Sequence, residues 1–161
     1  GTVSGDGINC TSSAGVDCTE TYPAGTIVTL TASTDPGSTF TGWSGACNHT
    51  DAVCTVAMVA ARSVTATFKL NQYPLSVSLA GTGGGSVSST PPGINCGVDC
   101  TENYDYGSLV SLTAVADSGS TFSGWGGACT GTGDCEVTMT EALSVTATFA
   151  RLDLYIPLIF R

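Results

Sequence analysis

The sequence predicts an all-β fold made of two tandem small, disulfide-stapled antiparallel β modules and a C-terminal extension strand. Three observations carry this prediction. The chain repeats itself, its eight cysteines divide evenly between the two halves, and charged residues make up only 11% of it. The polar positions are mostly Ser, Thr and Gly, which suit strands and tight turns better than helices.

The internal repeat is visible when the chain is aligned with itself at an offset of 81 or 82 residues. Self-similarity at a fixed period is the signature of a repeat architecture. We therefore expect a first module at 1–69, a linker at 70–72 and a second module at 73–150. The aligned blocks are GVDCTETY (15–22) with GVDCTENY (97–104), STFTGWSGAC (38–47) with STFSGWGGAC (120–129), and SVTATF (63–68) with SVTATF (144–149).

Within each copy, several segments alternate polar and apolar residues, as half-buried strands do. Stretches rich in Gly, Pro, Asp and Ser, such as DPGS (35–38) and DSGS (117–120), separate them and favour tight turns. The pattern predicts antiparallel hairpins. The alternating segments are TIVTLTA (26–32), LVSLTAV (109–115), CTVAM (54–58), CEVTM (135–139) and both SVTATF blocks.

The two copies differ at their beginnings, because the second opens with a full strand and turn, YPLSVSLAGTGG (73–84), and the first starts at GTVS (1–4). The first copy thus lacks its first strand. After the last SVTATF block the chain adds RLDLYIPLIFR (151–161), which is about as long as the missing piece. If this segment is extended, one face carries Leu152, Leu154, Ile156, Leu158 and Phe160.

Two interpretations of this segment remain open. It can fold back as a strand on its own chain, or it can add to the open edge of a neighbouring copy. The second arrangement is a head-to-tail contact, which propagates into a fibre unless it closes into a ring. In that case we expect Val3, near the incomplete edge of the first module, to join the five apolar side chains of the segment in the subunit interface.

The eight cysteines indicate a disulfide framework and an oxidising compartment, outside the cell or at its surface. Two intervals change length between the copies, and both lie between cysteines, which favours local pairing within each copy. Pairing of the early with the late cysteines remains the alternative. Zinc is disfavoured because the spacings are looser than those of zinc knuckles. The expected local pairs are Cys10 with Cys18, Cys47 with Cys54, Cys96 with Cys100, and Cys129 with Cys135.

Charge and hydropathy argue against two classes of partner. The net charge of −9, with only four Lys and Arg residues, leaves no basic surface for nucleic acid. No apolar run approaches the roughly 20 residues that span a bilayer, so no membrane span is expected. A start at Gly1 is typical of a processed or excised secreted chain.

No enzyme is predicted, because the sole histidine, His49, has no counterpart in the second copy and no Ser or Cys has a credible base. We expect Trp43 and Trp125 to fill the cores of the modules rather than to stack on sugars. Acidic residues recur near the first cysteine loop of each copy, but no regular calcium loop follows. We therefore interpret them as solvated turn residues and expect no cofactor or metal. They are Asp17, Glu20, Asp99 and Glu102.

The order of the blocks GINC, VDCTE, TLTA, STFxGWxGAC and SVTATF resembles the divergent internalin B-repeat family of bacterial surface and secreted proteins, over residues 1–150. The resemblance implies small β-rich tandem modules that serve as spacers, stalks or adhesive elements without catalytic residues. Residues 151–161 lie outside it.

Together these features predict a structural subunit of an extracellular filament, whose partners are copies of itself joined by donation of the C-terminal strand. The alternative is a stalk or ligand-binding module of a surface adhesin. Its ligand could be a carbohydrate contacted by the aromatic residues Tyr22, Tyr104 and Tyr106.

Overall fold

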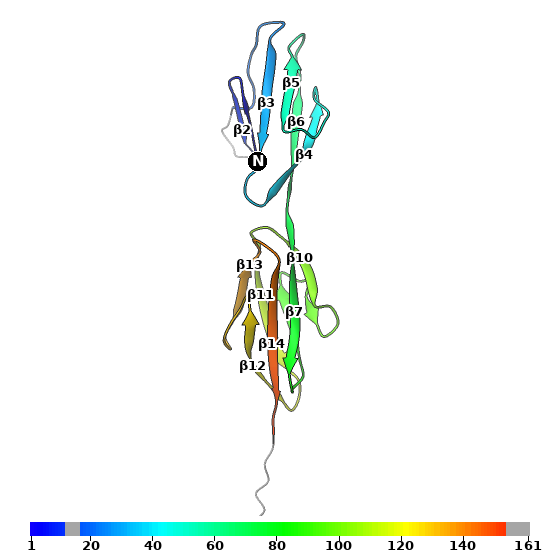
Figure 1. Ribbon diagram of the computed structural model, residues 1–161, viewed down its shortest axis with the longest axis vertical. Helices are drawn as coiled ribbons and strands as arrows, with labels where there is room; N and C mark the ends of the chain where they lie inside the picture. Colours follow the sequence, from blue (N-terminus) through cyan, green and yellow to red (C-terminus); the bar gives the residue numbers. More distant parts are fainter. Residues whose placement is uncertain (12–16, 154–161) are drawn as a thin grey trace, which may run out of the picture. The chain divides into compact units, whose positions relative to one another are not determined.

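The computed structural model describes residues 1–11 and 17–153 of the chain. It divides into two compact units, which we call module 1 (Gly1–Asn71) and module 2 (Gln72–Arg161) (Figure 1). All regular secondary structure in the described residues is β-strand. The all-β fold and the duplication are therefore confirmed. Most of the predicted C-terminal extension, residues 154–161, lies outside the described residues.

Module 2 is built from two four-stranded sheets, with the strand orders β10-β7-β14-β12 and β13-β11-β8-β9 (Figure 1). Alternate side chains of these strands form one core, in which Leu75, Phe149 and Met139 are at most 1% exposed. The strands are β7 (Gln72–Gly81), β8 (Gly85–Thr90), β9 (Asn95–Cys96), β10 (Thr101–Asp105), β11 (Leu109–Ala116), β12 (Ser120–Gly127), β13 (Cys135–Thr138) and β14 (Leu143–Arg151).

Module 1 repeats six of these eight strands. Its sheets have the orders β2-β1-β3-β5 and β4-β6, which match β9-β8-β11-β13 and β12-β14 of module 2. Among the described residues nothing corresponds to β7 or β10. The strands are β1 (Thr2–Gly5), β2 (Ile8–Thr11), β3 (Ile27–Ser33), β4 (Ser38–Gly45), β5 (Val53–Ala57) and β6 (Val64–Leu70).

Period-two alternation explains why these segments form strands. Along β3 exposed and buried residues alternate strictly, with Val28, Leu30 and Ala32 turned into the core. A strand with one apolar face is stabilised by burying that face and leaving the polar face in water. Buried residues also occupy alternate positions in β5 and β13 and in the first half of β11.

Two details differ from the sequence-based expectations. β7 pairs with β14 in parallel, so module 2 is not made of antiparallel hairpins alone. These two strands are the first and last of the module, and they lie side by side in one sheet. The chain between them supplies β10 and β12 to that sheet and all four strands of the other. The predicted linker at 70–72 is also too long, because Leu70 ends β6 and Gln72 begins β7, which leaves only Asn71 between the strands.

The repeated GW motif has a structural explanation. In module 1 the register between β4 and β6 shifts between Phe40 and Gly42, and Gly42 has a φ of 142°, which disfavours any side chain. This bulge turns Trp43 inward, where it is 4% exposed and its indole nitrogen donates to the carbonyl oxygen of Asp51 at 2.9 Å. Module 2 repeats the arrangement with Trp125, whose indole donates to Gly133.

Candidate strand-docking groove

Among the described residues, module 1 has no strand at the position that β7 occupies in module 2, and its core is open there. The difference is clearest at side chains that are identical in the two copies. Phe149 of module 2 is 1% exposed and Met139 is 0% exposed. Their counterparts Phe68 and Met58 are only partly buried. Val64 and Ala66 differ in the same way from Val145 and Ala147.

The opening is a groove of about 760 Å³, here called the module 1 groove. Its floor consists of core residues such as Val28, Leu30 and Trp43, and its walls include Val3, Tyr22 and Phe68. The same kinds of side chain surround β7 in module 2. The groove is therefore a mainly apolar slot with the lining of a strand site, and Glu20, Arg62 and several hydroxyl side chains also line it.

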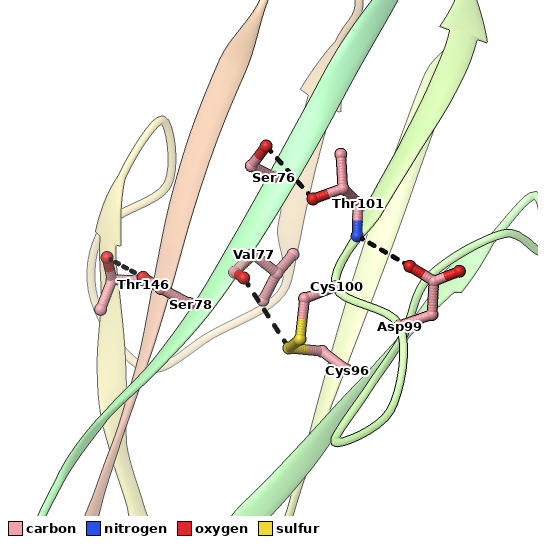
Figure 2. The surroundings of a disulfide bond; sticks show 8 residues. All are labelled: Ser76, Val77, Ser78, Cys96, Asp99, Cys100, Thr101 and Thr146. Carbon is pink, nitrogen blue, oxygen red and sulfur yellow. Dashed lines mark hydrogen bonds between the residues drawn. A yellow bond between two sulfur atoms is a disulfide. The ribbon is translucent and has the colours of Figure 1, made fainter.

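Module 2 shows how an occupied site is made. Leu75 and Val77 of β7 point into the core and are 0% and 6% exposed. The backbone of β7 pairs with β14 in parallel on one side and with β10 antiparallel on the other. Figure 2 shows the outward side chains bridging to both neighbours: the hydroxyls of Ser78 and Thr146 lie 2.9 Å apart, and those of Ser76 and Thr101 lie 3.5 Å apart.

The first disulfide of each module lies at this site. In module 2 the disulfide joins Cys96 and Cys100, and the Sγ atom of Cys96 lies 3.7 Å from the carbonyl oxygen of Val77 (Figure 2). The backbone N–H of Val77 donates to the carbonyl oxygen of Cys100 at 2.8 Å. In module 1 the corresponding disulfide, Cys10 with Cys18, lines the groove instead.

Both backbone edges of the groove are free of strand partners among the described residues. β6 pairs only with β4, whereas its counterpart β14 lies between β7 and β12. Residues 19–23 correspond to β10 but form no strand. Unpaired strand edges are ready templates for an added strand.

Tyr22 closes one wall of the groove. Its hydroxyl donates to the carbonyl oxygen of Asp6 at 2.6 Å. The pKa of this phenol is raised, first because its surroundings exclude water and then because the carboxylates of Glu20, Asp6 and Asp17 disfavour the phenolate. The side chain therefore remains a neutral hydrogen-bond donor at physiological pH.

The predicted interface residues are placed only in part. Val3 lies in β1, packs against the module 1 core and lines the groove. Leu152 is 54% exposed, just after the end of β14. The other four apolar residues of the C-terminal face, Leu154, Ile156, Leu158 and Phe160, lie outside the described residues.

All eight cysteines form disulfides in the local pattern, which leaves no thiolate for a zinc site. Cys47 pairs with Cys54, and Cys129 pairs with Cys135. All four side chains belong to the buried cores and are at most 8% exposed. No group of three or more His, Cys, Asp or Glu side chains in the described part of the chain could hold a metal ion.

The recurring acidic residues accept hydrogen bonds from nearby backbone. Asp17 accepts from the N–H of Thr19, and Asp99 accepts from the N–H of Thr101, each at 3.3 Å. Such contacts are typical of Asx turns. Glu20 and Glu102 accept from the N–H of the following residue.

One aromatic residue proposed as a sugar platform is wrongly placed for that role. Tyr104 is 6% exposed, and its hydroxyl lies 2.7 Å from Ser89 Oγ. Its strand position explains the burial, because Tyr104 faces the core of module 2 from β10, which pairs with β7. Tyr106 is partly buried, and its ring is tilted by 59° against that of Tyr73, with 6.4 Å between the ring centroids.

These features define a tandem of small, disulfide-stapled all-β repeat modules. The chain belongs to the divergent InlB B-repeat domain family, whose sequence model matches residues 2–72 and 75–153. No curated protein and no solved structure matches the chain. The family is one of extracellular structural or surface repeat modules, and it is typically non-catalytic.

The disulfides and the family together indicate an extracellular location. Within residues 1–11 and 17–153, no helix has the length and hydrophobicity needed to cross a membrane.

Proposed function

We propose that the protein is a non-enzymatic structural subunit that assembles head-to-tail outside the cell. In this assembly the apolar C-terminal segment of one copy occupies the module 1 groove of the next. The observation that carries the proposal is the groove itself, an apolar slot of about 760 Å³ where module 2 holds a buried strand.

The C-terminal segment has the composition that such a slot needs. Eight residues follow Asp153, and Leu154, Ile156, Leu158 and Phe160 alternate along them. Burying a Leu or Phe side chain is worth roughly 1.5 to 3 kcal/mol, so two or three such residues supply a large share of an association energy. Main-chain pairing on both sides of an added strand contributes further.

The contact joins two different surfaces of the subunit, a groove in module 1 and a tail that follows module 2. Such a heterologous contact repeats from copy to copy and produces an open fibre unless it closes into a ring. The proposal thus accounts for both the incomplete module and the apolar tail with one interaction.

Negative-stain electron microscopy of the chain beside a version truncated after Asp153 tests the proposal. The truncation keeps Arg151 in β14 and the hydrogen bond from the N–H of Leu152 to the carbonyl oxygen of Gly119. Module 2 therefore stays intact in the control. Fibres that disappear on truncation are expected.

Two other results would overturn the proposal. Fibres in both samples would mean that another surface joins the subunits. Dispersed monomers in both would leave a tandem surface module that serves as a stalk or ligand-binding element.

A further inference from the structure

Resting on the proposed function, we infer that the entering segment adopts the register of β7. Ile156, Leu158 and Phe160 of the second copy take the places that Tyr73, Leu75 and Val77 hold in module 2. The segment then runs parallel to β6, which it overlaps at Val64 and Thr65, and residues 19–23 become a strand on its other side.

The register follows from a match between two short segments. Residues 73–77 read Tyr-Pro-Leu-Ser-Val, and residues 156–160 read Ile-Pro-Leu-Ile-Phe. Both carry apolar side chains at the first, third and fifth positions and share Pro-Leu in the middle. Pro74 lies within β7 opposite Asn103, so this site accepts a residue without a backbone donor. Pro157 fits the same position. A slip of one residue would move Pro157 away from the place of Pro74 and would turn Leu158 outward.

The direction follows from the pairing of β14. In module 2, Val145 lies beside Val77 in a parallel ladder. Val64 is the counterpart of Val145, because both pair with the same glycine of the GW motif, Gly45 and Gly127 respectively. Phe160 therefore lies beside Val64 and next to the disulfide of Cys10. Val77 has the same place next to the disulfide of Cys96 in module 2.

The change at residues 19–23 follows from the comparison with β10. Residues 101–105 read Thr-Glu-Asn-Tyr-Asp and residues 19–23 read Thr-Glu-Thr-Tyr-Pro, yet only the former are a strand. The ladder partner of β10 is β7. β10 is an edge strand of its sheet, so a segment in its place without β7 has no ladder hydrogen bonds, and the missing partner explains the difference. Filling the groove supplies that partner.

Cross-linking tests the register. Ser76 and Thr101 lie opposite each other in module 2, and Ile159 and Thr19 are their counterparts in the assembled contact. One preparation carries Ile159→Cys and another carries Thr19→Cys, so a mixed disulfide can form only between different copies. The control pair uses Thr21→Cys in place of Thr19→Cys, which moves the thiol about 7 Å along the strand.

We expect the mixed disulfide of Thr19→Cys with Ile159→Cys to exceed that of the control pair by at least about tenfold. Peptide mapping must show that the disulfide between Cys10 and Cys18 is retained. Equal yields, or a preference for Thr21→Cys, in samples that still form fibres would overturn the register and leave the proposed function standing. Absence of fibres from the unsubstituted chain would overturn both.

Hydrogen exchange of the unsubstituted chain gives a second, independent readout. The amides of residues 19–22 should exchange at least about tenfold more slowly in fibres than in the protein truncated after Asp153. Fast exchange of these amides within fibres would contradict the formation of the new strand. Protection of these amides in a full-length monomer would show that the tail enters the groove of its own chain, which would overturn the head-to-tail contact.

Discussion

The Sγ atom of Cys96 lies 3.7 Å from the carbonyl oxygen of Val77, so the first disulfide of module 2 directly supports strand β7. Cys96 is 0% exposed, whereas its counterpart Cys10 is only partly buried. The first disulfide of each module therefore has a different role in the two modules. In module 2 it is part of a closed core, and in module 1 it forms part of the lining of an open groove.

This asymmetry predicts unequal effects of removing the two disulfides. In the loop-entropy model either staple contributes about 2 to 3 kcal/mol, because both close short loops. Replacing Cys96 and Cys100 by Ala also leaves a cavity beneath β7, which adds to the cost. We expect this variant to lose more free energy of unfolding than the one that replaces Cys10 and Cys18. Hydrogen exchange at increasing urea concentration reports the unfolding of each module and measures the difference. Equal losses of unfolding free energy in the two variants would contradict the packing argument.

A second prediction concerns the relative stability of the modules. In the protein truncated after Asp153, module 1 should unfold at a lower urea concentration than module 2. Its counterpart side chains, among them Phe68 and Met58, are partly buried where Phe149 and Met139 are fully buried. Less apolar surface is removed from water, so less stabilisation results. Module-resolved hydrogen exchange in urea is the measurement, and one cooperative transition for both modules would contradict it.

Sequence alone predicted the strands well, because burying one apolar face imposes period-two alternation that is visible in segments such as TIVTLTA. Comparison of the two copies also predicted that the first strand of module 2 has no counterpart among the described residues of module 1. The sequence could not predict that β7 pairs in parallel with β14, since alternation is the same for both strand directions. It also could not show that residues 19–23 form no strand, because their sequence closely matches that of β10.

The aromatic residues illustrate the other limit. Tyr104 looked exposed because tyrosine is often at the surface, but it faces the core and satisfies its hydroxyl with Ser89. Burial of a tyrosine depends on a partner from a distant part of the chain, and sequence spacing does not reveal that partner.

A third prediction concerns the buried face of the C-terminal segment. Leu158→Asp or Phe160→Asp should reduce assembly at least about tenfold, because each places a charge in an apolar slot and removes a buried side chain. Ile159→Ser is the matched control, since β7 carries Ser76 at that position. Sedimentation of fibres measures the effect. If the control weakens assembly as much as the two aspartates do, the assigned face is wrong.

A fourth prediction concerns alkaline pH. The folded protein holds the proton of Tyr22 to a higher pH than the unfolded chain does, because its pKa is raised from the ordinary value of 10.0. The stability from this group is full below about pH 10 and falls as pH rises through the raised pKa. Deprotonation also removes the hydrogen bond to Asp6.

The urea midpoint of module 1 should therefore fall as the pH rises above about 10. The variant Tyr22→Phe should show a smaller fall over the same range. An identical pH dependence in the two proteins would show that Tyr22 does not contribute.

The fifth prediction fills the groove within one chain. Gly1 is the counterpart of Gly85, and each packs against an aromatic ring, Phe68 and Phe149 respectively. Residues 73–84 directly precede Gly85, so the same twelve residues joined ahead of Gly1 are placed to enter the module 1 groove in the native register of module 2. The fused protein should gain stability in module 1, because two buried side chains and both ladders are restored.

The fused protein should also fail to form fibres, because the site for a neighbour's tail is filled. Thermal unfolding and electron microscopy measure the two effects. A control fusion with aspartate at the two buried positions should leave module 1 as it was and permit assembly. Fibres that persist in the apolar fusion would show that subunits join elsewhere.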